Sequence, residues 1–491
     1  MQRGVLLSIA GFCASVGLAQ SHTESGSPQR LVRLSVAATN VQGEPVTDLL
    51  PVDIQVLEDG KLRPVVFFRF AGSKRSVQPP GDGDFINRAG PIPTVILFDR
   101  WNERMLTSAR AWTELSATLQ HLESVNQIYV YFLTGSGELV PVQPLPLTTA
   151  DVHIAPEQTA AGLRDKLDRA VRQFQGLRAV DAVDPALRAS KTFQVLGALG
   201  AQMTPLPGRK NLIWITHGIP LNYDHPPYQI DLTPQVRSLS DSAAQYQIAI
   251  YTVDQSAEGS GADLVGQSRA TLKMISALTG GRWFGSDDID AALTGTLQDA
   301  RGIYAVAYYS AVREKDASDK EHKIRVESKR KDVRFLTREG YFGQITEPDP
   351  AKMEDAVFSG QIRSPFDAAE IGLRVHVSRD TTNRAAGKAA HFTIRIDPRD
   401  VFLERRGETY HGRFGLMFAF YAEGGFLEER STSTEVDIDL TPDQFNQALK
   451  EGAVVSKDVP VNERVRKIRL MVFDRLLHAL GSVTIPIDLA H

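Results

Sequence analysis

The chain has 491 residues, more than one compact core usually holds and enough for two or three domains of roughly 100–200 residues each. Hydrophobic residues make up 42% and charged residues 23%, proportions that exclude wholesale disorder and fibrous repeats. The formal net charge of −4 provides no basic field to hold a polyanion, so nucleic acid is not expected as a partner. A single cysteine, Cys13, excludes an intrachain disulfide and a thiolate metal cluster.

Residues 1–19 are typical of a secretory signal peptide. Arg3 precedes an apolar run, and the small residues Gly17 and Ala19 stand directly before a cleavage site between Ala19 and Gln20. A signal anchor or a buried first helix stays open as an alternative. No other segment approaches the ~20 apolar residues that cross a bilayer. We therefore expect an exported protein, secreted or periplasmic, with no transmembrane segment in the mature chain.

The residues that follow predict a small β unit over residues 30–70. Apolar and polar residues alternate there, as in a strand with one buried face. Asp59-Gly60 lies between two such runs and indicates a hairpin, because both central residues of a type I′ turn need positive φ. Prolines and glycines gather in residues 71–92, which predicts a linker.

Residues 91–345 alternate between apolar runs and helical periodicity. Near-continuous apolar runs are typical of strands that are covered on both faces. The alternation predicts βαβ units and an α/β fold with a doubly wound, mainly parallel Rossmann-like sheet. Ligands bind such sheets at the carboxyl ends of the strands. The four clearest runs are residues 94–98, 128–133, 211–216 and 248–253.

Residues 355–491 predict a C-terminal β-sandwich. Several runs in this part alternate so that each has one apolar face. One helix is expected to interrupt them, with Thr441 as its cap, Pro442 at its first position and Gly452 past its end.

Five short segments occur in a fixed order: VLEDGK at 56–61, VILFD at 95–99, GRKNLIWI at 208–215, LTGGR at 278–282 and REGY at 338–341. Together they resemble von Willebrand factor A (vWFA) domains, and more narrowly the vWFA-related family first catalogued in Acidobacteria. The resemblance covers roughly residues 31–345. It implies a vWA-like domain with a metal-ion-dependent adhesion site, where a cation on oxygen ligands binds a carboxylate of the partner.

The match to that adhesion site is partial. Asp99 takes the place of the first aspartate, but Trp101 and Glu103 stand where the family has serines. The later Thr-Asp pair reads Thr216-His217, so the second aspartate is missing. The resemblance therefore implies a degenerate site. No cofactor is expected, although Mg²⁺ or Ca²⁺ could bind in a rearranged way at Asp99, Asn102 and Glu103, with Thr192 as a candidate for the threonine from a later loop.

We interpret the protein as a non-enzymatic, adhesion-type protein that binds an unknown protein or a cell-surface ligand at the strand ends. Trp101 is either an exposed aromatic anchor for that partner or a packing residue over the sheet. The residues expected at this rim are Asp99, Trp101, Asn102, Glu103, Thr216, His217 and Asp254.

A metal-dependent hydrolase is the alternative that the residues leave open. Asp99, Glu103, His217 and His225 combine carboxylates with imidazoles, which hold Zn²⁺ or Mn²⁺ or act as general bases.

A purely structural envelope component is a third interpretation. The sequence contains no Gly-x-Ser-x-Gly elbow, phosphate-binding loop or His-Glu-x-x-His motif. A binding protein is therefore favoured over an enzyme.

Overall fold

The computed structural model describes most of the chain after residue 29. Residues 1–19, which the sequence predicts to be a signal peptide, lie outside the described residues, and so does Glu103. No helix in the described part is both long and apolar enough to cross a membrane. The described residues are 30–72, 81, 83–87, 92–102, 114–115, 117–119, 127–145, 159–174, 183–204, 206, 208–225, 228–256, 262–285, 288–312, 320–342, 350–364, 366–379 and 389–487.

The first strands pair with strands that come much later in the chain. β1 (Leu31–Asn40) lies between β14 (Ile303–Tyr309) and β16 (Val333–Leu336), and all of these pairings are antiparallel. β4 (Val65–Phe70) pairs with the other side of β14. The expected β unit at 30–70 therefore completes its sheet with residues beyond 300, because the backbone groups of β1 need partners on both sides.

A second four-stranded sheet packs against the first around a shared core that includes Val36, Val56 and Tyr304. Its hairpin turn has the positive φ values expected of a type I′ turn, 50° at Asp59 and 76° at Gly60, so the predicted hairpin is confirmed. The sheet has the order β17 (Gly340–Phe342), β15 (Glu321–Ser328), β2 (Ile54–Glu58), β3 (Lys61–Arg63), and the single turn η1 (Pro51–Asp53) precedes β2.

A six-stranded sheet follows between β4 and β14 in the chain. Five of its strands are parallel, and β8 (Leu139–Gln143) runs antiparallel at one edge, where Pro141 is exposed. The other edge is the two-residue strand β13 (Trp283–Phe284). The inner strands are β12 (Ile248–Asp254), β9 (Lys210–Thr216), β6 (Thr94–Asp99) and β7 (Ile128–Leu133), and every residue in them is buried.

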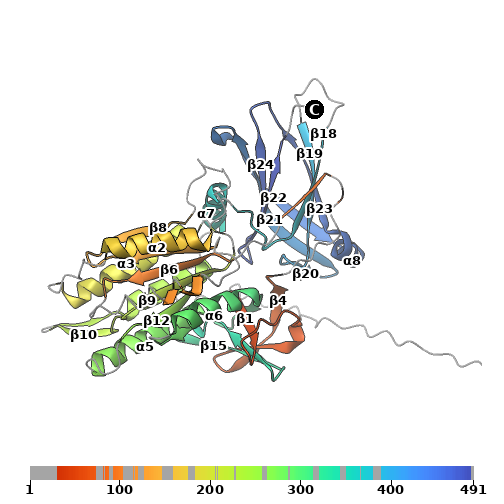
Figure 1. The fold of residues 1–491 in the computed structure, drawn as a ribbon. Coiled ribbons are helices and arrows are strands. Elements are labelled where there is room, and N and C mark those ends of the chain that lie inside the picture. The colour runs from red at the N-terminus through yellow and green to blue at the C-terminus, as the bar shows by residue number, and fades with distance from the viewer. Residues whose placement is uncertain are drawn as a thin grey trace, which may run out of the picture.

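Helices cover both faces of this sheet (Figure 1). α3 (Pro185–Met203), α4 (Thr233–Gln245) and α5 (Ala262–Thr279) pack on one face. α2 (Ala160–Phe174) and α6 (Ile289–Arg301) pack on the other. The hairpin of β10 (Asn222–His225) and β11 (Tyr228–Asp231) extends from the connection between β9 and α4.

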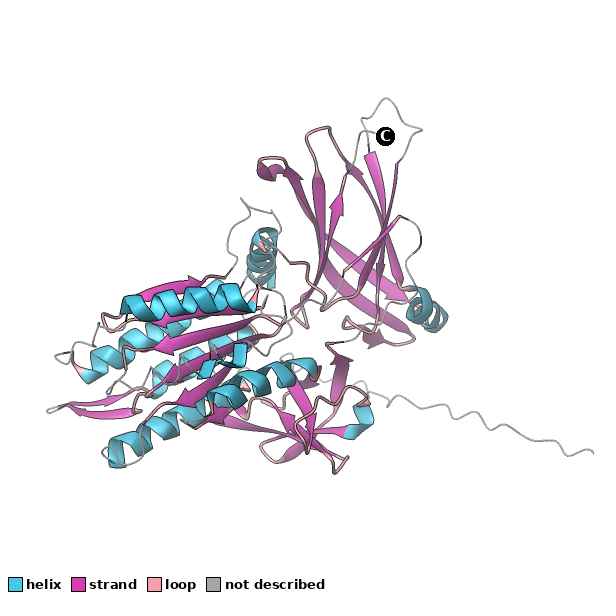
Figure 2. Ribbon diagram, viewed as in Figure 1, coloured by secondary structure: helices cyan, strands magenta, loops and turns pink. Residues whose placement is uncertain are grey.

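The fold class predicted from the sequence is wrong for the chain. The described residues hold more strand than helix, and five of the six sheets contain only antiparallel pairs (Figure 2). The remaining sheet is mixed. The chain is therefore a β-rich assembly, and neither a doubly wound Rossmann-like class nor a vWA-like fold describes it. The error arises because alternation of strands and helices is a local pattern, whereas sheet pairing is set by distant segments.

The C-terminal part contains two antiparallel sheets around one large apolar core, which fits the expected sandwich in part. α7 (Pro350–Arg363) precedes them. One sheet has the order β23 (Ala453–Pro460), β19 (Ala389–Ile396), β18 (Leu373–Arg379), β5 (Asp84–Ile86). The other contains β20 (Glu404–Arg406), β21 (Thr409–Ala422), β24 (Lys467–Asp474) and β25 (Ala479–Pro486), with β22 (Gly425–Leu440) also paired to β21. β5 lies within the segment 71–92 that was expected to be a linker.

The single helix predicted within the sandwich is confirmed as α8 (Pro442–Glu451). Thr441 Oγ1 accepts a hydrogen bond from the Gln444 backbone N–H, and the Gln444 side chain accepts one from the Thr441 N–H. This is a complete capping box. Gly452 follows the helix with φ 87°, a conformation that disfavours side chains with a Cβ.

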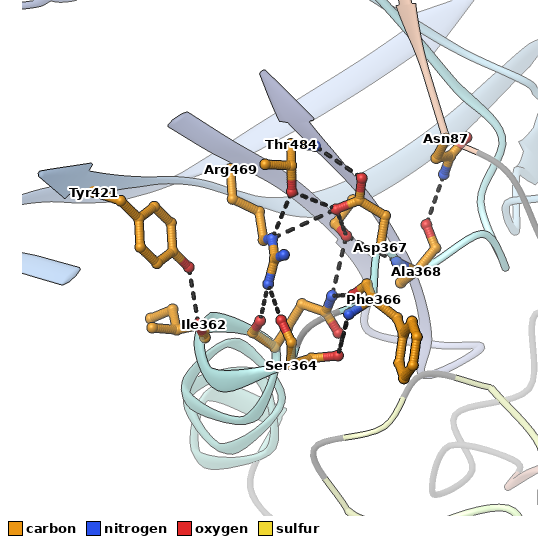
Figure 3. A network of polar contacts seen from close by, with 11 residues as sticks. Asn87, Ile362, Ser364, Phe366, Asp367, Ala368, Tyr421, Arg469 and Thr484 are labelled. Carbon is orange, nitrogen blue, oxygen red and sulfur yellow. Dashed lines mark hydrogen bonds and ion pairs between the residues drawn. The ribbon is translucent and has the colours of Figure 1, made fainter. Parts of the chain in front are cut away.

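Polar contacts join the sandwich to the rest of the chain. The Arg33 guanidinium donates to the Leu476 carbonyl oxygen at 2.9 Å, and Gln247 Nε2 donates to Glu370 Oε1 at 3.1 Å. Within the sandwich, the buried Arg469 guanidinium holds the end of α7 through the Ser364 carbonyl oxygen at 2.6 Å, and it forms an ion pair with Asp367 (Figure 3).

His478 lies beside this junction in a left-handed backbone conformation, with φ 52°. Its ring stacks on Phe473 with 6.2 Å between the ring centroids. Burial, together with the smaller effect of the positive charge of Arg33, lowers the pKa of His478 to about 3. The imidazole is therefore neutral in the folded protein at all ordinary pH values.

We expect His478→Asn to remove a pH dependence of stability, because asparagine tolerates positive φ and does not titrate. The unfolded chain binds a proton at His478 below about pH 6.5, whereas the folded chain does so only near pH 3. Stability is therefore lost as the pH falls through this window. From pH 7.5 to 5.0 the wild type should lose about 2 kcal/mol more free energy of unfolding than the variant. Urea unfolding of both proteins measures this difference, and equal losses would contradict it.

Candidate functional site

The carboxyl ends of β6, β9 and β12 meet at one edge of the six-stranded sheet, which we call the carboxyl edge. Thr216 is the register partner of Asp254 on the neighbouring parallel strand. The Gln255 backbone N–H donates to the Thr216 carbonyl oxygen at 2.8 Å, and Ser256 Oγ donates to the His217 carbonyl oxygen at 3.2 Å. The loops that follow β9 and β12 are therefore joined by hydrogen bonds.

Asp99 ends β6 and is 5% exposed. Its Oδ2 accepts hydrogen bonds from Thr216 Oγ1 at 2.7 Å and Trp214 Nε1 at 3.1 Å. Asn102 donates to both oxygens, through its backbone N–H to Oδ1 at 3.0 Å and through Nδ2 to Oδ2 at 2.6 Å. Burial raises the pKa of Asp99 above its usual range, and these hydrogen bonds oppose that rise. The carboxyl group is held entirely by donors of its own chain.

The hydrogen bonds continue from Asp99 to helix α3. Asn102 Nδ2 also donates to Thr192 Oγ1 at 2.8 Å, and that hydroxyl donates to the Arg188 carbonyl oxygen at 3.0 Å. Thr216 Oγ1 accepts from the Gly218 N–H at 3.0 Å. We call the set formed by Asp99, Asn102, Thr192, Trp214 and Thr216 the Asp99 network. It brings four of the residues singled out from the sequence into direct contact.

Trp101 is a packing residue. It is 6% exposed, and its Nε1 donates to the Arg188 carbonyl oxygen at 3.0 Å. The Arg188 guanidinium lies over the indole ring, 4.9 Å from the centroid. Gly137 approaches the ring so closely that an added Cβ would lie 3.3 Å from it. The interpretation of Trp101 as an exposed anchor for a partner is therefore wrong.

Asp254 has side-chain hydrogen-bond partners outside the Asp99 network. Asp254 is 1% exposed and accepts hydrogen bonds from Arg269 Nε at 2.8 Å and from the Ser256 N–H at 2.9 Å. His217 is half-buried in the loop after β9. His225 lies in β10, and its side chain, like Glu103, is outside the described part. Two of the four side chains named for a hydrolase therefore lie outside the described residues.

The described members of the Asp99 network do not fit a hard cation. Mg²⁺ and Ca²⁺ are bound by six or more oxygen atoms, and each of these directs a lone pair toward the ion. Around Asp99, however, Asn102, Trp214 and Thr216 present N–H and O–H groups. The Thr192 hydroxyl is occupied by Asn102 and Arg188. No cluster of three His, Cys, Asp or Glu residues in the described ranges has a geometry that holds a metal.

Trp214 is the member of this network that the sequence analysis missed. It lies in the apolar middle of β9, next to Leu97 in the parallel register of β6 and β9. A buried indole N–H needs an acceptor. Asp99 lies two residues beyond Leu97 on the adjoining strand and is a possible acceptor. These two features of the sequence could have predicted the contact.

Comparisons with known proteins leave the family open. No family model matches the chain, and no curated protein matches it. Thirty chains of solved structures match, among them the human COPII-coat protein Sec24c, with 11% identity and a TM-score of 0.27 over 52% of this chain and 44% of that one. This chain thus spans less than half the length of the Sec24c structure. A likeness this weak supports no argument about fold or function, and the vWFA-related resemblance stays a prediction.

We expect Thr216→Val to destabilise the folded chain by about 1–3 kcal/mol, because it removes a donor from buried Asp99 and the acceptor of the Gly218 N–H. The matched control is Thr434→Val on the exposed face of β22, which should change stability little. Denaturant unfolding gives both values. The prediction fails if Thr216→Val is as stable as the wild type. If Mg²⁺ or Ca²⁺ then also raises the melting temperature of the wild type, a cation rather than the hydroxyl satisfies Asp99.

Proposed function

We propose that this chain is an exported binding protein that holds a protein or cell-surface ligand at the carboxyl edge and catalyses no reaction there. The observation that carries the proposal is the Asp99 network, in which the polar groups of three neighbouring segments satisfy one another. Such a network fixes the positions of the surrounding loops without leaving a reactive group at the surface.

The environment of the two buried carboxylates favours binding over catalysis. A general base must come within hydrogen-bond reach of the proton that it removes. Asp99 is enclosed by its own donors, and Asp254 is paired with Arg269. Neither carboxylate presents a free oxygen to a substrate in this arrangement. No contact among the described residues favours the alternative of a hydrolase that uses Asp99, Glu103, His217 and His225.

Among the described elements at this edge, the β10–β11 hairpin projects beyond the sheet (Figure 1). Its base is closed by a hydrogen bond from the Leu232 N–H to the Leu221 carbonyl oxygen at 2.9 Å, and both leucines pack into the core under α3 and α4. Asn222, Gln229 and Asp231 are exposed along it. A ribbon anchored in this way can present side chains and a strand edge to another protein.

We expect replacement of residues 222–231 by a short Gly-Ser link to weaken partner binding at least tenfold while leaving the melting temperature nearly unchanged, because the base of the hairpin is retained. A photo-crosslinking residue at Gln229 would first identify the partner, with the same residue at exposed Glu408 on the sandwich as the control. Surface-based binding measurements with the purified partner then give the affinity ratio, and EDTA should change it less than twofold.

The opposite results are equally specific. Partner binding that survives loss of the hairpin, or that disappears on chelation, would contradict the proposed site. A hydrolytic activity found in a screen of ester, phosphate and peptide substrates with Mn²⁺ or Zn²⁺, and lost in His217→Ala, would replace the proposal by the hydrolase.

A further inference from the structure

The described part of the chain forms a cavity of about 710 Å³ at the amino edge of the six-stranded sheet, opposite the carboxyl edge. Three regions line it. β1, β4 and β14 form one wall, and the residues at the amino ends of β7, β9 and β12 form the second. The third comes from the sandwich, through residues 366–370 and 477–479. Its volume is within the range of small-molecule sites.

The lining carries more positive than negative charge. Its two carboxylates are already engaged: Asp367 accepts hydrogen bonds from Thr484 and pairs with Arg469 (Figure 3). Glu370 accepts from Gln247 at 3.1 Å and from the Leu480 N–H at 3.3 Å. The lining also contains five arginines: Arg33, Arg69, Arg209, Arg301 and Arg338.

At least four of these guanidinium groups donate to neutral acceptors, Arg33 to the Leu476 carbonyl oxygen and Arg69 to the Glu370 carbonyl oxygen among them. Arg209 donates to Ser35 Oγ at 2.9 Å, to the Gly280 carbonyl oxygen at 3.0 Å and to the Tyr251 hydroxyl at 3.2 Å. Arg338 donates to the Arg33 carbonyl oxygen at 3.1 Å. Neutral acceptors satisfy N–H groups but leave the charge uncompensated.

Nearby acids offset this excess only in part. Asp400 forms an ion pair with Arg69 at 3.8 Å, and the charge of Arg338 opposes the rise that burial causes in the pKa of Asp241. Asp299 accepts from the Tyr251 hydroxyl but forms its ion pair with Arg282 at 3.1 Å. Burial lowers the pKa of Arg338 to about 10, and the positive charge of Arg33 contributes to that shift. A guanidinium whose charged form is disfavoured in this way would be stabilised by an anion.

Unpaired polar atoms are concentrated in the same place. Buried polar atoms in folded proteins nearly always have hydrogen-bond partners. Arg69 and Thr337 are 8% and 9% exposed, yet Arg69 Nε and Thr337 Oγ1 make no hydrogen bond. The Arg69 guanidinium donates instead to the Glu370 carbonyl oxygen, and it forms an ion pair with Asp400 in which Nε and Oδ1 are 3.8 Å apart. Arg338 Nε and His478 Nδ1 are also buried and unpaired. All four residues line the cavity, and their unpaired atoms lie buried just behind its wall.

The rest of the wall is apolar. Phe67, Ile248, Leu297, Ile303 and Leu477 contribute hydrocarbon surface beside the guanidinium groups. Small-molecule sites commonly combine a largely apolar lining with a few polar groups that fix orientation. A bare inorganic ion would leave this apolar surface uncovered, whereas an amphiphilic molecule would cover it.

We propose that the cavity binds a small organic anion, with its carboxylate or phosphate group held by Arg69 and Arg338 and its apolar body against Phe67 and Leu477. Thr337 and Arg69 supply the unpaired donors, and a guanidinium pairs with either oxyanion. Since the wall includes β4, the sheet and the sandwich, the bound molecule would also hold these three regions together.

The test is calorimetric titration and thermal shift of the full mature chain with octanoate and octyl phosphate, with octanol as the uncharged match and inorganic phosphate as the head group alone. We expect one or both anionic amphiphiles to raise the melting temperature in a saturable way, since a ligand that binds only the folded state stabilises it. Octanol and inorganic phosphate should bind at least tenfold more weakly. The better of the two amphiphiles identifies the acidic group.

Arg338→Gln should weaken binding of that amphiphile at least tenfold, and Arg405→Gln, at an exposed position on β20, should leave it unchanged. Because Arg338 lies at a crowded junction, Thr337→Val and Arg301→Gln at the exposed end of α6 provide further variants whose folding is checked by circular dichroism. Absence of binding by both amphiphiles would overturn the proposal. Equal affinity in the cavity variants and in Arg405→Gln would overturn it as well.

Discussion

The pairing of β1 with β14 is the constraint on which the rest of the structure depends. Seven residues of β1, from Leu31 to Ala37, are in register with residues 303–309. After β4 the chain leaves the first sheet, forms the six-stranded sheet, and returns to the first sheet at β14. The six-stranded sheet is therefore an insertion between two strands of the first sheet. The two ends of the inserted sheet therefore have different surroundings. Its amino edge faces the flanking sheets and the sandwich, while its carboxyl edge faces away from them (Figure 1).

The two edges also differ in how their polar groups are satisfied. At the carboxyl edge, Asp99 accepts hydrogen bonds from Asn102 and Thr216, and Asn102 also donates to Thr192. At the amino edge, Arg69, Thr337 and Arg338 keep buried atoms without partners. The paired groups of the carboxyl edge form a rigid frame. The unpaired groups of the amino edge can accept a molecule from outside the chain as their partner.

Local features could be predicted from the sequence, and distant pairings could not. The Asp59-Gly60 turn and the cap of α8 follow from side-chain and φ requirements within a few residues, and both are present. Asp99 is at the end of a buried strand, as its position after an apolar run indicated. The fold class was wrong because β1 and β2 find their partners beyond residue 300, which no periodicity reveals. The burial of Trp101 depends on Arg188 and Gly137, which are likewise distant in the chain.

The outer strands of the six-stranded sheet limit how this protein can associate with itself. Proline has no N–H to donate, so Pro141 interrupts the ladder that a neighbouring strand would need along β8. On the opposite side β13 offers only two residues, too few to template a strand from a second molecule. Strand pairing between molecules is therefore disfavoured on both flanks, and chains at high concentration should resist fibril growth through this sheet.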